Sequence, residues 1–276
     1  MKITITKDAG YCFGVRDAVN MAYDAAEKHG DVYMLGSIVH NEKVVNDLKN
    51  AGTKIVNNLS DVPDDSPILF RAHGTVNNLW EEAKAKNMNI VDATCPLVYE
   101  IHQEVKKLAE DGRQIIVIGD HGHDEVVAIA GQVDKSIVVS SPEEAKKLRK
   151  MKKAGIVSQS TQAIENVQAI MNILMTKVFD LHFINTICFP TKRNHDQIKE
   201  IAEVNDIMII IGSFTSANSK RLTQLSLDRN SNSYQVTGKQ DLNPKWFKYM
   251  STIGISAGAS TPDYLIDEVK NCIEII

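Results

Sequence analysis

Three of the four cysteines in the chain stand where a strand pattern stops and a helix pattern begins. Cys12 lies in "AGYCFGV", Cys95 in "VDATCPLV" and Cys188 in "NTICFPT". In the cytoplasm, such cysteines bind metals or react more often than they form disulfides, although buried core positions are the alternative. Cys272 lies inside the helical pattern "YLIDEVKNCIEII" and has no counterpart elsewhere, so we expect it in the core.

The spacing of these cysteines reveals a threefold internal repeat. Cys12 and Cys95 are 83 residues apart, and Cys95 and Cys188 are 93 apart, each close to a third of the 276 residues. After each cysteine a helical pattern leads into an apolar strand, which ends at a glycine 24 residues beyond that cysteine. These glycines are Gly36, Gly119 and Gly212. The common offset favours one shared role as metal ligands over three unrelated core positions.

Polar side chains follow the strand patterns in all three repeats. Open α/β sheets bind ligands outside the carboxyl ends of their strands, where helix N-termini also attract anions. If the repeats pack with these ends inward, three thiols converge and are ringed by imidazoles, hydroxyls, an amide and one carboxylate. The polar residues concerned are His40, Asn41, His73, His123, Glu125, Gln159, Ser160, Thr161, Thr191, Ser216, Asn218, Ser219 and Ser260.

The three cysteines fit an iron–sulfur cluster better than structural zinc. Structural zinc is closed by four ligands and usually comes with closely spaced pairs such as C-x-x-C, which the chain lacks. Thiolates from distant segments hold [4Fe–4S] clusters, and three of them leave one iron open to act on a substrate oxygen. We therefore predict one [4Fe–4S] cluster per chain, held by Cys12, Cys95 and Cys188, with one iron not bound by cysteine.

The surrounding residues predict a phosphate-bearing substrate and a proton donor. The donors suited to phosphate oxygens are His40, His73, His123, Ser216, Asn218 and Ser260. Serine and asparagine are also ordinary helix N-caps, and the two roles are compatible. Glu125 is the one carboxylate expected near the cluster, where exclusion from water favours its acid form and suits a proton donor. The alternative for Glu125 is a solvated glutamate at a helix start.

The elements that must position these residues alternate between strands and helices. Short apolar strand patterns separated by longer helical patterns are typical of βαβ crossovers and parallel sheets. We predict an α/β fold of three pseudo-threefold-related units around a central cluster site, each with a mainly parallel sheet of about four strands. The units cover residues 13–95, 96–188 and 189–276, and the N-terminal strand in 1–12 completes the third.

The composition excludes several other classes of protein. With 43% hydrophobic residues, 24% charged residues and a net charge of −4, the chain has no basic face suited to nucleic acid. No apolar run approaches the ~18 residues of a membrane span, and the start "MKITITKDAG" is a strand pattern rather than a targeting signal. We expect a cytoplasmic protein that binds neither nucleic acid nor membranes.

Eight motifs carry a resemblance to one enzyme family. They are "GYCFGV", "VHNEKVV", "RAHG", "DATCPLV", "GHDEV", "INTIC", "SANSKRL" and "AGASTP". In their order and spacing the chain resembles, from about residue 9 to residue 263, the LytB-type 4-hydroxy-3-methylbut-2-enyl diphosphate reductases. The resemblance implies three α/β lobes around an oxygen-sensitive [4Fe–4S] cluster. It also implies reductive removal of an allylic hydroxyl, giving isopentenyl and dimethylallyl diphosphates in the last step of the methylerythritol phosphate pathway to isoprenoids.

The resemblance also assigns roles to single positions. Cys12, Cys95 and Cys188 would ligate the cluster, and the diphosphate would be held by His40, His73, His123, Ser216, Asn218 and Ser260. Glu125 would deliver the proton, Ser160 would bond the substrate hydroxyl, and His123 joins both in the catalytic set. Three places depart from the family: Ser160 replaces a threonine, Ala217 replaces a second serine, and "FPTKRNHD" follows Cys188, so Lys192, Arg193 and Asn194 receive no role.

Electrons must reach such an enzyme from outside. No G-x-G-x-x-G fingerprint follows a strand pattern, so an external donor such as flavodoxin or ferredoxin is expected. The basic run "KKLRKMKK" at 146–153 is the candidate docking segment, although a solvated helix end explains it better. Two other functions stay open. The first is another enzyme with an open iron, either a hydro-lyase or a quinolinate-synthase-like enzyme, which would need arginines to bind the carboxylate groups of its substrate. The second is a redox sensor that carries a cluster and binds a partner.

Overall fold

Three four-stranded parallel sheets form the framework of the chain. The computed structural model describes residues 1–276, and every strand pairing in it is parallel. The predicted α/β class with sheets of four strands is confirmed. None of the helices combines the length and the apolar character that crossing a membrane requires.

The chain divides into two compact units. The terminal unit comprises residues 1–16, 39–47 and 189–276, and the middle unit comprises residues 17–38 and 48–188. The predicted ranges 13–95, 96–188 and 189–276 follow the sequence repeats instead, and each range contains the strands of one sheet, with the N-terminal strand added to the last. We retain these three ranges as a proposal for the repeat.

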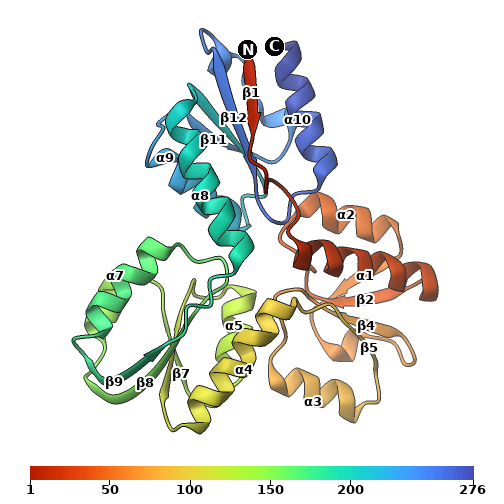
Figure 1. Cartoon of the computed structure of the whole chain (residues 1–276). Coiled ribbons are helices and arrows are strands. Elements are labelled where there is room, and N and C mark those ends of the chain that lie inside the picture. The colour runs from red at the N-terminus through yellow and green to blue at the C-terminus, as the bar shows by residue number, and fades with distance from the viewer. The chain divides into compact units, whose positions relative to one another are not determined.

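The sheet of the terminal unit has the strand order β1-β12-β10-β11 (Figure 1). Its strands are β1 (Lys2–Ile5), β10 (Ile207–Ile211), β11 (Ser233–Val236) and β12 (Thr252–Ala257). The helices of this unit are α8 (Phe189–Val204), α9 (Ala217–Leu227), α10 (Asp263–Ile275) and the short η2 (Lys239–Asp241) and η3 (Pro244–Phe247). The sequence assigns the N-terminal strand to this sheet, and β1 pairs with β12 so that Ile3 lies opposite Ile253.

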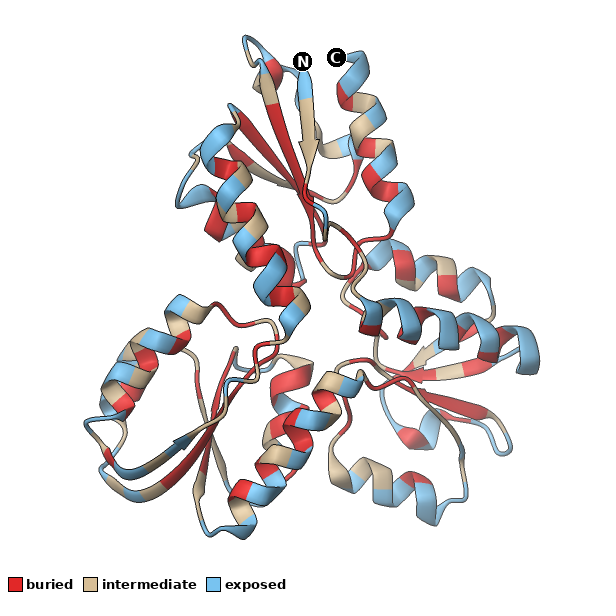
Figure 2. Cartoon of the chain, viewed as in Figure 1, coloured by how far each residue is buried: buried red, intermediate tan, exposed pale blue.

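Alternation along β10 explains why this sheet is covered on both faces. Ile207, Ile209 and Ile211 pack with α10, whereas Met208 and Ile210 pack with α8 and α9. Successive side chains of a strand point to opposite faces, so an unbroken apolar run requires helices on both sides. Figure 2 shows the result as buried strands beneath helices whose outer faces are exposed.

The middle unit contains the other two sheets. The first has the order β3-β2-β4-β5, with β2 (Val32–Leu35), β3 (Thr53–Val56), β4 (Pro67–Phe70) and β5 (Asn89–Asp92). Its helices are α1 (Phe13–His29), α2 (Glu42–Asn50), α3 (Asn77–Ala85) and η1 (Leu59–Asp61); α1 and α2 have residues in both units. Phe70 and Trp80 meet edge to face in its core, with ring centroids 4.6 Å apart.

The second sheet of the middle unit repeats the same design. Its order is β7-β6-β8-β9, with β6 (Gln114–Ile118), β7 (Ser136–Val139), β8 (Met151–Ser158) and β9 (Val178–Phe183). Its helices are α4 (Pro96–Glu110), α5 (Asp124–Ala130), α6 (Pro142–Lys147) and α7 (Ile164–Leu174). Ile115 and Val117 of β6 pack with α4 and α5, while Ile116 and Ile118 pack with the face that α7 covers.

The three repeated cysteines mark helix starts rather than strand ends. Cys12, Cys95 and Cys188 directly precede α1, α4 and α8, whereas β1, β5 and β9 end several residues earlier. Before Cys188 the ladder stops because the Thr186 hydroxyl bonds both the N–H and the C=O of Ser158, at 2.8 and 2.5 Å. Cys272 lies on α10 and is half-buried, where the sequence predicts a core position.

Gly155 on β8 provides a test of the packing of α4. A Cβ added at Gly155 would lie 2.8 Å from the Cβ of Leu108, a buried residue of α4. We expect Gly155→Ala to lower the free energy of unfolding by about 1–3 kcal/mol, because helix and strand must move apart. Urea denaturation of both proteins measures this difference. Equal midpoints would show that α4 can move away from β8 without lowering the free energy of unfolding.

Candidate active site

The predicted site residues are divided between the two units. The terminal unit holds Cys12, His40, Ser216, Asn218 and Ser260, and the middle unit holds Cys95, Cys188, His73, His123, Glu125 and Ser160. In both units these residues follow the carboxyl ends of β1, β2, β4, β5, β6, β8, β9, β10 and β12 or start the next helix. This placement is the one that the sequence pattern predicts. The meeting of all three thiols stays a prediction.

Glu125 is a buried carboxyl held by Ser160. Glu125 lies in the first turn of α5 and is 2% exposed. The backbone N–H of Ser160 donates to Oε1 at 2.6 Å, and the Ser160 hydroxyl donates to Oε2 at 2.9 Å. Burial raises the pKa of Glu125 to about 7, against the lowering effect of both hydrogen bonds, with a further rise from Asp120. A carboxyl that gains and loses its proton near neutral pH is suited to general acid catalysis.

Two histidines lie beside this carboxyl in the middle unit. His123 is the N-cap of α5, and its Nδ1 accepts a hydrogen bond from the backbone N–H of Glu125 at 3.2 Å. An Nδ1 that accepts leaves the ring proton on Nε2, so a neutral His123 is the Nε2–H tautomer. His73, which follows β4, meets His123 edge to face with ring centroids 5.5 Å apart. The two imidazoles therefore form one group of donors at neighbouring strand ends.

Ser160 also links the carboxyl to one of the cysteines. The backbone N–H of Cys188 donates to the carbonyl of Ser160 at 3.0 Å. Cys95 is the N-cap of α4, and its own N–H donates to Ala72 at 3.1 Å. Both thiols are half-buried and directly precede a helix. The middle unit thus contains two of the three thiols that the sequence predicts as ligands.

The terminal unit holds a third thiol and a buried amide without partners. Cys12 and Asn218 both line a hollow of about 470 Å³, the Cys12 hollow. Asn218 is 6% exposed, and neither its Oδ1 nor its Nδ2 has a hydrogen-bond partner in the protein. An unpaired buried amide costs about 1–3 kcal/mol, so both polar atoms of Asn218 are available to bond a ligand or a water molecule in the hollow.

The two serines of this unit hold the surrounding loops. Ser216 is the N-cap of α9, and its hydroxyl accepts from the N–H of Ser219 at 3.3 Å. The Ser260 hydroxyl donates to the carbonyl of His40 at 3.1 Å, so the loop after β12 fixes the loop after β2. Both serines are buried and lie at helix starts or loop turns, where capping and ligand binding are compatible.

Other polar residues at the strand ends serve the loops themselves. The Asn41 side chain accepts from the N–H groups of Lys43 and Val44 and so caps α2. Gln159 accepts from the N–H of Asp120 at 3.0 Å. Asn194, to which the sequence assigns no role, donates to Ala257 at 3.1 Å and is buried. Asn41 therefore stabilises a helix start, whereas Gln159 and Asn194 each connect two segments that are far apart in the sequence.

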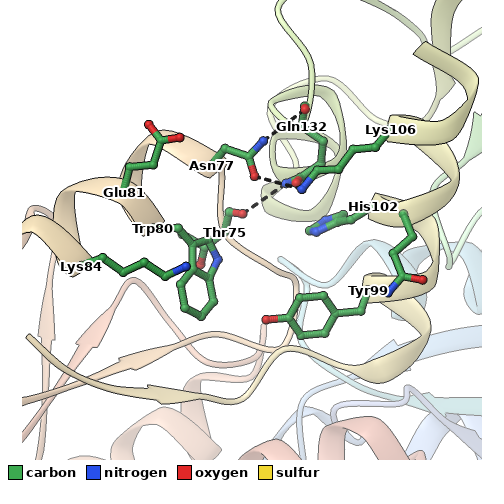
Figure 3. A pocket seen from close by; sticks show the side chains of 10 residues that line it. Thr75, Asn77, Trp80, Glu81, Lys84, Tyr99, His102, Lys106 and Gln132 are labelled. Atoms are coloured by element: carbon green, nitrogen blue, oxygen red, sulfur yellow. Dashed lines mark hydrogen bonds between the residues drawn. The ribbon is translucent and has the colours of Figure 1, made fainter. Parts of the chain in front are cut away.

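His102 is a buried polar residue that the motifs do not single out. It lies on the buried face of α4 and lines a second hollow of about 400 Å³, together with Trp80, Tyr99 and Gln132 (Figure 3). Its Nε2 has no hydrogen-bond partner, and burial lowers the pKa of His102 to about 4. The sequence could have revealed His102, because it is a polar residue on the apolar face of the helical pattern at 96–110.

The His102 ring also supports the turn that carries His73. Gly74 has φ +85°, and a Cβ there would lie 2.7 Å from His102 Cε1. Only glycine adopts this conformation without strain, and only glycine leaves room for the ring. His102 packs against the turn at Gly74, and this contact helps to fix the position of the neighbouring His73.

The raised pKa of Glu125 predicts how stability depends on pH. Below pH 4.5, the ordinary value, the carboxyl is protonated in both folded and unfolded chains and costs nothing. As the pH rises from about 4.5 to about 7, the unfolded chain ionises first, so the folded protein loses stability on the order of 3 kcal/mol. Glu125→Gln removes this loss, because glutamine does not ionise.

Urea unfolding at pH 5 and pH 8.5 measures this effect. We expect the wild type to lose stability relative to Glu125→Gln between the two values. An unchanged difference between the two proteins at both pH values would contradict a raised pKa for this carboxyl.

Comparison with known proteins places the chain among one set of relatives. The family whose sequence profile matches it is described as "LytB protein", and the match covers residues 3–274. A relative from Geotalea uraniireducens, named 4-hydroxy-3-methylbut-2-enyl diphosphate reductase, is 42% identical over 100% of this chain and 98% of its own length. A relative of the same name from Geobacter metallireducens is 41% identical over 98% of this chain and 95% of its own.

Two solved structures share the fold over the whole chain. A structure of (E)-4-hydroxy-3-methyl-but-2-enyl diphosphate reductase, described as the terminal enzyme of the non-mevalonate pathway, has a TM-score of 0.72 and 35% identity, covering 100% of this chain and 99% of that one. The E-1-hydroxy-2-methyl-but-2-enyl-4-diphosphate reductase from Plasmodium falciparum has a TM-score of 0.93 and 28% identity, covering 99% and 87%.

Proposed function

The chain belongs to the LytB family, and on that premise we propose that it reduces 4-hydroxy-3-methylbut-2-enyl diphosphate to isopentenyl and dimethylallyl diphosphates. It is an oxidoreductase, as the named relatives are. The reaction breaks the allylic C–O bond, consumes two electrons and two protons, and releases water. It would be the last step of the methylerythritol phosphate pathway. The observation that carries this proposal is the buried Glu125 carboxyl, held by Ser160 next to Cys188 and titrating near pH 7.

Cys12, Cys95 and Cys188 are the residues that would hold the metal cofactor of the family. All three are half-buried, all three directly precede a helix, and their ligand atoms are all sulfur, which fits an iron–sulfur cluster. Cys272 on α10 is not at a helix start, so three thiols and an iron without cysteine are the natural count. When bound, a [4Fe–4S] cluster supplies electrons and a Lewis-acidic iron.

Six residues are proposed to bind the diphosphate. Asn218 offers an amide whose two polar atoms lack protein partners, and His123 offers Nε2–H. His40, His73, Ser216 and Ser260 complete the proposed set, each at a strand end or a helix start where backbone N–H groups also favour anions. Half-buried and buried donors of this kind hold a phosphate with little rearrangement, since the loops are already fixed.

Glu125 and Ser160 would act on the leaving hydroxyl. Ser160 Oγ lies 2.9 Å from Glu125 Oε2, and a hydroxyl can either donate or accept at this distance. When Glu125 is protonated, its O–H would donate to Ser160 Oγ, and the Ser160 O–H would donate to the oxygen of the substrate hydroxyl. A proton passed along this chain would reach the departing oxygen, which leaves as water. The burial that raises the pKa of Glu125 keeps the proton available near neutral pH.

The alternative of a carboxylate-binding hydro-lyase finds no support in the middle unit. Arg71 is the arginine that follows a strand there, and it pairs with Asp124 at 2.7 Å. A guanidinium engaged in this way is not presented to a substrate carboxylate. The strand ends offer imidazole, hydroxyl and amide groups instead.

Replacing one ligand cysteine tests the cofactor. We expect anaerobically reconstituted wild type to bind about four irons per chain and show thiolate-to-iron absorption. Cys95→Ser should lose most of both and most turnover of hydroxymethylbutenyl diphosphate. Cys272→Ser is the matched control and should keep iron and activity. Full turnover in Cys95→Ser without iron would end the cluster proposal.

Replacing the carboxyl tests the proton donor. Glu125→Gln keeps the shape of the side chain but cannot supply the acidic proton, so we expect turnover to fall by about two or more orders of magnitude. Substrate binding, measured by calorimetry, and iron content should stay near wild type. A rate within a few fold of wild type would remove Glu125 from the mechanism.

A further inference from the structure

Two phenylalanines stack on each other in the terminal unit and remain exposed. Phe13 is 38% exposed and Phe189 is 52% exposed, and their rings lie 5.6 Å apart at an angle of 9°. Phe13 directly follows Cys12, and Phe189 directly follows Cys188. Because the two rings are stacked, their exposed parts form one continuous aromatic surface, which suits contact with a partner.

Cationic side chains surround this aromatic pair. Phe13 and Phe189 line the Cys12 hollow together with Arg16 and Arg193. Arg193 lies over the Phe189 ring at 5.8 Å and pairs with Asp8 at 2.6 Å, while Arg16 pairs with Asp263 at 3.5 Å. Lys7 also lines the hollow, so three cationic side chains and two carboxylates line it, although the whole chain carries −4.

The proposed reaction makes an electron-entry surface necessary. Two electrons are consumed in each turnover, and no dinucleotide fingerprint follows any strand, so a second protein must supply them. Such a protein has to approach the cysteines that hold the cofactor. Aromatic residues and arginine are the types enriched at the centres of protein interfaces. The Phe13–Phe189 pair with Arg16 and Arg193 has this composition directly beside Cys12.

We propose that the Phe13–Phe189 pair is the docking point of a small acidic electron-transfer protein. This inference rests on the proposed function, because it assumes that Cys12 ligates the redox cofactor. The rings provide an apolar contact that desolvates on binding, and the surrounding cations attract an acidic partner and orient it. The reduced partner is oxidised as its electrons pass to the cofactor, and the partner then leaves.

The basic run at 146–153 lies far from Cys188, so it is less suited to bind an electron donor. It spans the end of α6 and the start of β8, at the amino end of that strand. Ser160, whose carbonyl bonds Cys188, follows the carboxyl end of β8. At ~3.3 Å per residue, roughly 23 Å separates Met151 from Ser158.

The experiment compares Phe13→Ala/Phe189→Ala with wild type, using a bacterial flavodoxin as the acidic probe. Surface plasmon resonance at low salt should show about tenfold weaker flavodoxin binding to the variant. In turnover assays KM for flavodoxin should rise by a similar factor, whereas the rate with dithionite-reduced methyl viologen should not change. Lys150→Glu/Lys152→Glu is the charge control and should leave flavodoxin binding within twofold of wild type.

Assays with flavodoxin and with methyl viologen distinguish a failure of the docking proposal from a failure of the proposed function. Wild type that fails to turn over with methyl viologen contradicts the function. Unchanged flavodoxin binding in the double variant, with normal methyl viologen turnover, overturns the docking surface. If the double variant loses iron, Phe189→Ser replaces it, because that change leaves Phe13 beside Cys12. Weaker flavodoxin binding by Phe189→Ser with normal iron content supports the proposal, and wild-type binding refutes it.

Discussion

The backbone and hydroxyl of Ser160 connect the groups on which the chemistry of the middle unit depends. Its N–H and O–H hold the two oxygens of Glu125, and its carbonyl receives the N–H of Cys188. Ser160, in the loop after β8, therefore sets both the orientation of the buried Glu125 carboxyl and the position of the Cys188 thiol. None of these three contacts depends on whether the side chain also carries the methyl group of a threonine.

The parallel direction of the strands makes such contacts possible. In each sheet the carboxyl ends of the strands lie at one edge, and each following helix starts there with unpaired N–H groups. Cys95, His123 and Ser216 are N-caps in three different βα connections. The same local geometry thus presents sulfur, imidazole and hydroxyl groups, and the sequence repeat changes the chemistry while it keeps the scaffold.

Several features of these edges cost stability. Glu125 is buried although its ionisation is opposed by burial, and the amide of Asn218 is buried without partners. Phe13 and Phe189 expose their rings. Apolar runs such as 207–211, covered by helices on both faces, provide the burial that offsets these costs. The buried carboxyl, the unpaired amide and the exposed rings lie where a substrate, a cofactor or a partner is proposed to bind.

The sequence by itself determined the repeat, the alternation of strands and helices, and the placement of His40, His73, Glu125 and Ser260 after strands. These follow from periodicity, which is a local property of the chain. Only the tertiary structure decided that Ser160 hydrogen-bonds Glu125 and that the pKa of this acid lies near 7. It also decided that His102 packs against the turn that carries His73, and that Phe13 stacks on Phe189. Each of these joins residues far apart in the sequence, and packing alone brings such residues into contact and removes water from them.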